Sequence, residues 1–219
     1  MSEKTSAITI IDYGAGNIRS MVNMLRSIGV KSQVSGDPAE IGSAHRLILP
    51  GVGHFDHGMK ALHGRGLVDA LNRRVLEDGI PILGICLGAQ LLTRGSEEGC
   101  EPGLGWIDAR TVAFARDKLG PALRVPHMGW ADTWALRDNP FSLAIPSDAR
   151  FYYVHSFHLE CERDENAILA AHHGYDFTAG IQRDNILGLQ FHPEKSHRYG
   201  MQVLKSFLAW TPGSKAAAV

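Results

Sequence analysis

Short apolar runs alternate with amphipathic stretches along the first half of the chain. Runs of β-branched and aliphatic residues are typical of buried strands, and apolar positions three or four residues apart are typical of helices packed on a sheet. This pattern predicts strands over residues 7–11, 31–35, 46–49 and 80–85, and helices over 18–28, 62–76 and 87–92. Such an order favours a mainly parallel sheet with helices on both faces.

The second half of the chain is richer in strand-like segments. The pattern predicts short β-like pieces within residues 103–124, strands over 151–157, 168–172, 178–182 and 185–191, and a helix over 199–210. The tail 211–219 is expected to be frayed. We therefore expect a single α/β domain over residues 1–219, with a flavodoxin-like, mainly parallel central sheet to which antiparallel strands are added.

The composition limits the kinds of protein that this chain can be. Of its 219 residues, 44% are hydrophobic and 21% are charged, and a formal net charge of -1 offers no attraction for nucleic acid or an anionic membrane. No apolar run is long enough to span a bilayer, and residues 1–7 lack the apolar centre of a signal peptide. Cys86, Cys100 and Cys161 are too widely spaced to suggest a disulfide framework or a zinc site. A reducing, cytoplasmic setting is expected.

The stretch Gly84-Ile85-Cys86-Leu87-Gly88 joins a predicted buried strand directly to a predicted helix. Its two glycines allow a tight turn and keep side chains away from the thiol. A cysteine at this corner lies at a helix N-terminus, where backbone amides and the helix dipole favour the thiolate. The amide of Leu87 is well placed to donate to an oxyanion. A structural cysteine is the ordinary alternative, but the flanking glycines favour a nucleophile.

A second polar pair, His192 and Glu194, follows another predicted buried strand. Residues two apart in extended backbone point the same way, and Pro193 biases His192 towards that conformation. A carboxylate beside an imidazole raises its basicity and fixes its tautomer, as in a nucleophile–base–orienter relay. Because both segments end predicted strands of one sheet, we expect Cys86, His192 and Glu194 to meet at its carboxyl edge. Alone, His192 would be read as an ordinary histidine.

Two loops with glycines follow strands nearer the N-terminus. Asp12-Tyr13-Gly14-Ala15-Gly16-Asn17 lacks the third glycine of a dinucleotide fingerprint, so nucleotide binding is not favoured there. Pro50-Gly51-Val52-Gly53 comes straight after a buried strand and is typical of a rigid backbone feature.

Together, these motifs resemble the class-I (triad-type) glutamine amidotransferases. The resemblance rests on residues 84–90, 50–53 and 190–194 and covers roughly Ile8 to Leu208. Within that family, residues 12–17, 126–130, 153–156 and 192–196 are similar to the glutaminase subunits of imidazole glycerol phosphate synthase, an enzyme of histidine biosynthesis. The departures are small, since Ala89 stands where a methionine is common and residues 54–57 are unusually rich in histidine.

The resemblance implies hydrolysis of L-glutamine to glutamate and ammonia by Cys86, His192 and Glu194, with no metal or organic cofactor. In the family pattern the oxyanion is held by backbone groups, here at Val52, Gly53 and Leu87. The positions that match those gripping the amino-acid end of glutamine are Gln90, Glu98, Ser156 and Phe157. For Glu98, an acidic turn in solvent is the alternative.

The resemblance also implies a protein partner. Ammonia lost to water is protonated and stops being a nucleophile, so the glutaminase would form a heterodimer with a separate synthase (cyclase) subunit and pass ammonia through a shielded passage. The positions that match this interface are Asn17, His127, Met128, Trp130 and Lys195. Core packing of Trp130 and a solvated charge at Lys195 are the ordinary alternatives. No nucleic acid or membrane partner is implied.

Other functions remain open on the sequence alone. One is a related amidotransferase that supplies ammonia to a sugar-amidating synthase of surface polysaccharide biosynthesis, because residues 196–201 are similar to such relatives. A cysteine peptidase or other hydrolase on the same fold is disfavoured by Gln90 and by residues 126–130. A non-catalytic regulatory module is disfavoured because Cys86, His192 and Glu194 are all present.

Overall fold

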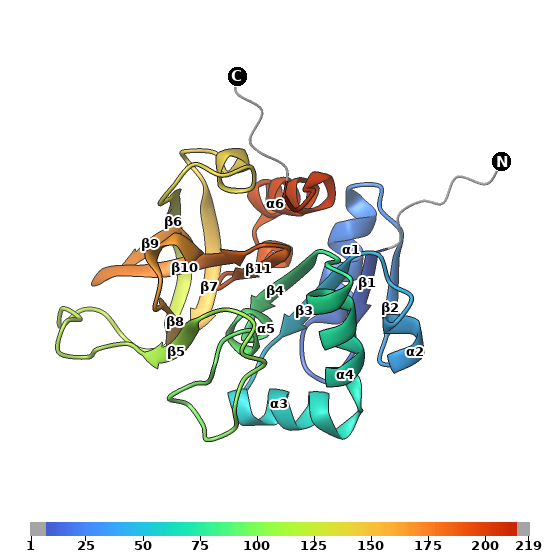
Figure 1. The fold of residues 1–219 in the computed structure, drawn as a ribbon. Coiled ribbons are helices and arrows are strands. Elements are labelled where there is room, and N and C mark those ends of the chain that lie inside the picture. Colours follow the sequence, from blue (N-terminus) through green and yellow to red (C-terminus); the bar gives the residue numbers. More distant parts are fainter. Residues whose placement is uncertain (1–7, 214–219) are drawn as a thin grey trace.

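The computed structural model describes residues 8–213 of the chain (Figure 1). Within this range, eleven strands form one sheet. The strands are β1 (Ile8–Ile11), β2 (Ser32–Ser35), β3 (Leu47–Gly51), β4 (Ile82–Cys86), β5 (Ala109–Ala113), β6 (His127–Ala135), β7 (Arg150–His155), β8 (Phe157–Cys161), β9 (Ala167–His173), β10 (Tyr175–Arg183) and β11 (Ile186–Leu189). Nine of them lie in the order β2-β1-β3-β4-β11-β10-β9-β6-β7. Of the other two, β8 pairs with β10, and β5 pairs with β8.

The first five strands of that order are parallel and form the centre of the fold. β1 pairs with β2 and β3, and β4 pairs with β3 and β11, all in parallel. This is the flavodoxin-like strand order, and it confirms the predicted central sheet. The remaining strands extend the sheet in antiparallel pairs, as predicted.

Helices cover both faces of the parallel strands (Figure 1). The helical segments are α1 (Ile18–Ser27), α2 (Pro38–Ile41), α3 (Phe55–Gly64), α4 (Leu67–Asn72), the π-helical η1 (Arg73–Glu77), α5 (Leu87–Leu91), α6 (His197–Ala209) and the 3-10 turns η2 (Ser142–Ala144), η3 (Asp164–Asn166) and η4 (Pro193–Lys195). Because successive strand residues face opposite sides, Ile10 packs in the core beneath α1 and α6, whereas Ile11 packs in the core beneath α3 and α4.

The predicted helix over residues 62–76 is wrong in its bounds. Helix α3 begins at Phe55, and Gly66, with a left-handed φ of 65°, separates it from α4. The start of α3 is hard to see in the sequence because its cap is a histidine: His54 Nδ1 accepts a hydrogen bond from the Asp56 amide at 3.2 Å. Gly58 also interrupts the apolar pattern of α3, although it is buried on the inner face of the helix, where an added Cβ would lie 3.1 Å from Leu91 Cδ1.

The second half also differs in detail from the sequence pattern. The predicted strand over 151–157 is two strands, β7 and β8, that meet at Ser156, and residues 103–124 contain only one strand, β5. The hairpin strands 168–172 and 178–182 are confirmed as antiparallel β9 and β10. Fraying of the tail falls largely on residues 214–219, which lie outside the described residues. Within residues 8–213, no helix has the length and apolar character to cross a bilayer.

Candidate active site

Cys86 stands at a sharp corner between β4 and α5. It is the last residue of the strand, and its φ of 53° and ψ of -112° lie outside the regions that a non-glycine residue ordinarily occupies. Only 6% of its surface is exposed. Strained backbone at a strand-to-helix corner is the geometry of a nucleophile elbow, because it turns the side chain out over the edge of the sheet.

Glycines let the backbone around this corner pack at very short range. A Cβ on Gly88 would lie 1.8 Å from the Leu49 carbonyl oxygen, and one on Gly84 would lie 2.7 Å from the Gly88 carbonyl oxygen. No side chain can be accommodated at either distance. The two glycines therefore allow α5 to begin directly against β3 and β4, as the sequence predicts.

His192 and Glu194 follow β11, which is parallel to β4 and pairs with it through Leu189 and Ile85. Both segments consequently reach the same carboxyl edge of the sheet. His192 Nδ1 lies 2.8 Å from Glu194 Oε1, and the two side chains are 1% and 4% exposed. Nδ1 is thus occupied by Glu194, and Nε2 has no nitrogen or oxygen partner among the described residues. A side-chain hydrogen bond with Cys86 is one of the causes that raise the pKa of this imidazole, so Nε2 is the nitrogen available for proton transfer.

The charge on His192 is set by its surroundings. Burial alone would lower the pKa of its imidazole, but the negative charge of Cys86 and the neighbouring Glu194 carboxylate outweigh burial and raise that pKa to about 10. The imidazolium is therefore favoured when the cysteine is a thiolate. Burial first, and then the same Cys86 charge, raise the pKa of the Tyr13 phenol well above its ordinary value, so this nearby side chain keeps its proton.

A cavity of about 330 Å³ opens beside Cys86. Its lining contains every residue predicted to hold the oxyanion or the amino-acid end of glutamine: Val52, Gly53, Leu87, Gln90, Glu98, Ser156 and Phe157. Pro126, Val154 and His155 complete it. The structure thus brings together segments that are far apart in the sequence, from the end of β3 to the start of β8.

Gln90 is held in one orientation at the wall of this cavity. Its Nε2 donates to the Phe157 carbonyl oxygen and to Gln190 Oε1, both at 3.2 Å. Gln190 in turn places its own Nε2 3.9 Å from Cys86 Sγ. Both amide hydrogens of Gln90 have acceptors, so its carbonyl oxygen is the group on that amide that can accept from a substrate ammonium. Gln190 and His155 were not singled out in the sequence, although both lie in strands that it predicts.

Glu98 has a structural task besides lining the cavity. Its Oε2 accepts the Phe55 amide hydrogen at 2.8 Å, at the start of α3. Asp56 anchors the same region, since its Oδ1 accepts from the amides of Cys100 and Glu101, both at 2.9 Å. The unusual stretch 54–57 therefore ties the loop 96–101 to α3 and keeps Glu98 at the cavity.

Three of the predicted docking positions lie on one exposed face next to Glu194. Met128 and Trp130 are 64% and 41% exposed. The Trp130 ring stacks parallel to His197 at 5.6 Å, and Lys195 Nζ lies 5.5 Å above the Tyr152 ring. We call the cluster of exposed Met128, Trp130 and His197 with half-buried Tyr152 and Lys195 the aromatic face.

The other two docking positions are placed differently. His127 is only 6% exposed, and its ring stacks on Tyr153 and His173 inside the fold, so it offers little surface to a partner. Asn17 is half-buried and caps α1, with its Oδ1 accepting from the Ser20 amide at 3.4 Å.

The other two cysteines lie away from this cavity. All three thiols are free; Cys100 is exposed and Cys161 is partly buried. Burial, reinforced by Asp164, raises the pKa of Cys161 to about 12, which keeps this thiol protonated and unreactive. Among residues 8–213, no group of three or more potential ligands is arranged to hold a metal ion.

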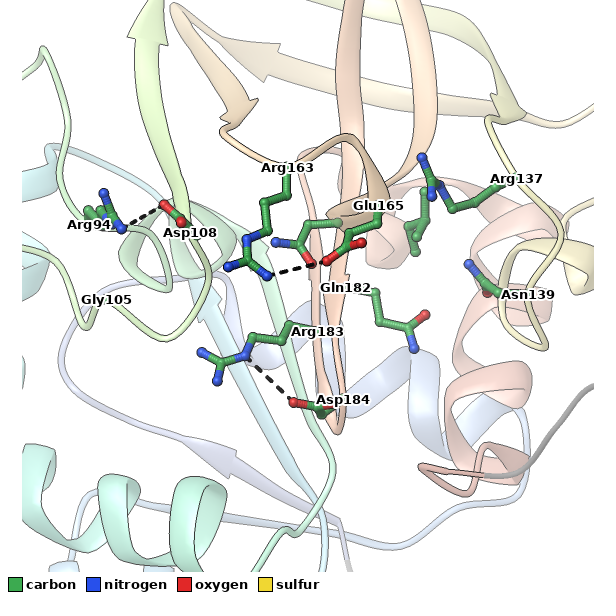
Figure 2. Close-up of a pocket in the computed structure, with 12 residues that line it drawn as sticks. Arg94, Gly105, Asp108, Arg137, Asn139, Arg163, Glu165, Gln182, Arg183 and Asp184 are labelled. Carbon is green, nitrogen blue, oxygen red and sulfur yellow. Dashed lines mark ion pairs between the residues drawn. The ribbon is translucent and has the colours of Figure 1, made fainter.

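A cavity larger than the one beside Cys86 lies elsewhere in the fold. It measures about 610 Å³ and is lined mainly by charged side chains (Figure 2). The ion pairs Arg94–Asp108, Arg163–Glu165 and Arg183–Asp184 cross or flank it. It borders the turn before β11 and so lies at the opposite edge of the sheet from Cys86. Because three of its four arginines are paired with carboxylates and its lining holds no cysteine, serine or histidine, we assign the chemistry to the smaller cavity.

Comparisons with known proteins show which family the chain resembles. The family described as glutamine amidotransferase class-I matches residues 9–210. The imidazole glycerol phosphate synthase subunit HisH 2 of Pseudomonas aeruginosa is 46% identical over 203 residues, covering 92% of this chain and 98% of that protein. Subunit HisH of the same synthase from Leptospira interrogans is 42% identical over 200 residues, with 91% and 98% covered. The solved structure of PurLQS from Thermotoga maritima is similar in fold, with a TM-score of 0.71 at 22% identity over 94% of this chain and 98% of that one.

Proposed function

The chain belongs to the class-I glutamine amidotransferase family, and we propose that it is the glutaminase subunit of imidazole glycerol phosphate synthase. It hydrolyses L-glutamine to glutamate and ammonia and supplies the ammonia to a separate synthase (cyclase) subunit in histidine biosynthesis. One combined observation carries this function. The chain is 46% identical to such a subunit over 92% of its length, and it has Cys86, His192 and Glu194 at one edge of its sheet.

The first half of the proposed reaction makes a thioester. The Cys86 thiolate attacks the side-chain carbonyl carbon of glutamine, and the amides of Leu87 and Gly53 stabilise the resulting oxyanion. His192 Nε2 gives its proton to the amide nitrogen, the carbon–nitrogen bond breaks, and ammonia leaves. The pKa of about 10 at His192 supports this role, because the imidazolium is already formed when glutamine arrives.

The second half releases glutamate. Neutral His192 takes a proton from water as the water oxygen attacks the thioester carbon, and the carbon–sulfur bond then breaks to restore the thiolate and the imidazolium. Glu194 Oε1 accepts a hydrogen bond from Nδ1 of His192 across the 2.8 Å contact and so fixes the orientation and tautomer of the ring. Gln90, Glu98 and the Ser156-Phe157 corner bind the amino-acid end of glutamine, an assignment supported by their place in the cavity.

The proposed docking surface is the aromatic face. It adjoins Glu194 through Lys195, and large exposed aromatic side chains of this kind are the usual anchors of protein interfaces. Asn17 and His127 are the other two positions that match the interface in the family pattern. A free working thiol and the absence of any helix in residues 8–213 that could span a bilayer support a cytoplasmic setting.

One alternative keeps the chemistry and changes the partner. Several relatives carry a copy number in their names, among them HisH 2 of Pseudomonas aeruginosa and HisH 2 of Methanococcus maripaludis. A second copy could serve a different synthase, for example one that amidates a sugar for a surface polysaccharide, through the same catalytic site.

The test is glutamate release by the purified chain, alone and with the cyclase subunit of imidazole glycerol phosphate synthase and its nucleotide ligand. We expect little activity alone, a strong rise with that subunit, and none in a Cys86→Ala variant. If glutamate release rises with a sugar-amidating synthase and not with the cyclase subunit, the alternative function is the correct one. Absence of glutamine turnover with either partner would refute both.

A further inference from the structure

Four buried histidines, of which His155 also lines the glutamine cavity, take no part in the proposed mechanism. His127, His155, His158 and His173 are each 6–8% exposed and surround the ring of Phe114. Buried polar groups are costly unless each finds a partner, so their hydrogen bonds show what they hold in place.

His155 has a partner at each ring nitrogen. Its Nδ1 lies 2.8 Å from the Phe157 carbonyl oxygen, and its Nε2 lies 3.2 Å from His127 Nδ1. A carbonyl can only accept, so Nδ1 of His155 carries the proton. In a neutral ring Nε2 is then an acceptor, and His127 Nδ1 must be the donor to it. The two contacts together fix the tautomers of both rings.

The hydrogen bonds continue from Phe157 to the catalytic sulfur. The Phe157 carbonyl oxygen also accepts from Gln90 Nε2, Gln90 donates to Gln190, and Gln190 Nε2 points at Cys86 Sγ. Every donor in this series faces an acceptor. A single polar chain therefore runs from His127, at the start of β6, to Cys86.

The surroundings keep both rings neutral, as the chain requires. Burial, together with the charge of His173, lowers the pKa of His127 to about 4. Burial also lowers the pKa of His155 well below its ordinary value, assisted by His127, His158 and His173 and opposed by the bond to Phe157. The titratable groups packed around the pair are His158 on β8, His173 on β9, Tyr153 on β7 and Tyr175 on β10.

We propose that His155, locked by His127, is a positioning residue that sets the substrate-binding amide of Gln90 through the Phe157 carbonyl. This inference rests on the proposed glutaminase function and deepens it. The bond from His155 Nδ1 to a carbonyl two residues ahead closes the β7–β8 corner, where Ser156 and Phe157 line the cavity. Without that bond the corner can rotate, and Gln90 loses the acceptor that holds its carbonyl oxygen towards the substrate.

The first test separates glutamine binding from chemistry. His155→Leu removes the donor to Phe157, whereas His155→Asn places an amide nitrogen near the former Nδ1 and retains it. In the complex with its synthase partner, we expect His155→Leu to raise the KM for glutamine about 5- to 30-fold, the effect of losing one orienting hydrogen bond, with kcat changed less than about 3-fold. His155→Asn should restore the KM to within about 3-fold of wild type.

His158→Leu is the matched control. His158 is buried in the same cluster and bonds to the Leu159 carbonyl and the Tyr175 hydroxyl, but it is outside the chain to Gln90. A merely structural role for these histidines predicts that the Leu variants at 155 and 158 lower thermal stability alike and leave KM unchanged. An unchanged KM in His155→Leu, or an equal rise in His158→Leu, overturns the proposal.

The second test does not depend on activity or on any variant folding. Nitrogen-15 NMR of the wild-type imidazoles should show both His127 and His155 neutral and protonated at Nδ1 at pH 7. Protonation of His155 at Nε2 instead would overturn the proposal. Should the wild-type chain fail to turn over glutamine with any partner while both tautomers are as expected, the proposed function fails and the hydrogen-bonded chain stands as a structural feature.

Discussion

His192 Nδ1 lies 2.8 Å from Glu194 Oε1, with both side chains almost fully buried. A buried imidazole would ordinarily lose its charge, and the nearby Cys86 charge, together with the Glu194 carboxylate, reverses that tendency by raising the pKa of His192. This contact turns a histidine at a strand end into a proton carrier of fixed orientation, and it makes the behaviour of the site testable residue by residue.

Replacing Glu194 by Gln should slow turnover and narrow the pH range of activity. Gln leaves His192 in place but removes the Glu194 charge, one of the causes that raise its pKa beside the larger one from Cys86, so we expect kcat to fall about 10²- to 10⁴-fold. In the wild type, we expect activity to fall at alkaline pH as His192 gives up its proton near its pKa of about 10. In the variant this alkaline limb should move towards neutral pH. A pH profile of kcat/KM measures it, and an unmoved limb would contradict the assigned role.

Gly88→Ala should damage the fold around the elbow. The added methyl would lie 1.8 Å from the Leu49 carbonyl oxygen, a backbone atom that cannot yield without moving β3. We expect the free energy of unfolding in urea to fall by about 3 kcal/mol or more, with loss of activity. Gly64→Ala, at the end of α3 with open space at the Cβ position, is the control and should change stability by less than about 1 kcal/mol. Equal effects of the two substitutions would show that the close approach is not what the elbow needs.

Acid should destabilise the fold through the buried histidines. The folded-state pKa of His127, about 4, is below the 6.5 of an unfolded histidine, so the unfolded chain binds more protons between those values. Stability is therefore fully present above pH 6.5 and is lost as the pH falls towards 4, by up to about 1.4 kcal/mol per pH unit for each such residue. His192, whose pKa is raised, gains stability as the pH falls from 7 to about 6, because the unfolded histidine takes up its proton there, and this gain offsets the loss from one buried histidine. Below about pH 5.5 His192 is protonated in both states and adds nothing to the slope. Urea unfolding at pH 6, 5 and 4.5 should show the loss, and His127→Phe, which keeps the stacked ring, should reduce the slope.

Trp130→Ala should weaken binding to the synthase subunit without unfolding the chain. Trp130 is 41% exposed at the centre of the aromatic face, and central tryptophans are frequent hot spots of interfaces. We expect the Kd, measured by calorimetry, to rise about 30-fold, equivalent to about 2 kcal/mol. Leu76→Ala, 52% exposed on η1 at the other side of the sheet, is the matched control and should bind normally. Normal binding by the Trp130 variant would place the interface elsewhere.

The parts of this protein that the sequence predicts are those encoded locally. The strand-to-helix corner at Cys86 is visible because paired glycines and an apolar run lie within a few residues of it. The His192 and Glu194 pair is visible because an extended His-Pro-Glu segment determines its own geometry. Both then meet because parallel strands share a carboxyl edge, which is a rule of topology and not of sequence distance.

The parts that the sequence does not predict depend on long-range pairing or on unusual caps. His155 and His127 are brought together by the antiparallel register of β6 and β7, which no local pattern specifies. The start of α3 is missed because a histidine caps it. The task of Glu98 at the Phe55 amide depends on a loop that Asp56 folds back onto α3. In each case the deciding contact joins residues whose partners cannot be identified from spacing alone.

The most direct test of the account is covalent labelling by a glutamine analogue whose side-chain amide is replaced by a diazoketone. The chain, in a Cys100→Ser, Cys161→Ser background and bound to its synthase partner, would be treated with the analogue and digested for mass spectrometry. The account predicts one adduct, on the peptide that contains Cys86, which excess glutamine prevents and which forms more slowly in the Glu194→Gln variant. Turnover of glutamine without any adduct on Cys86 would contradict it.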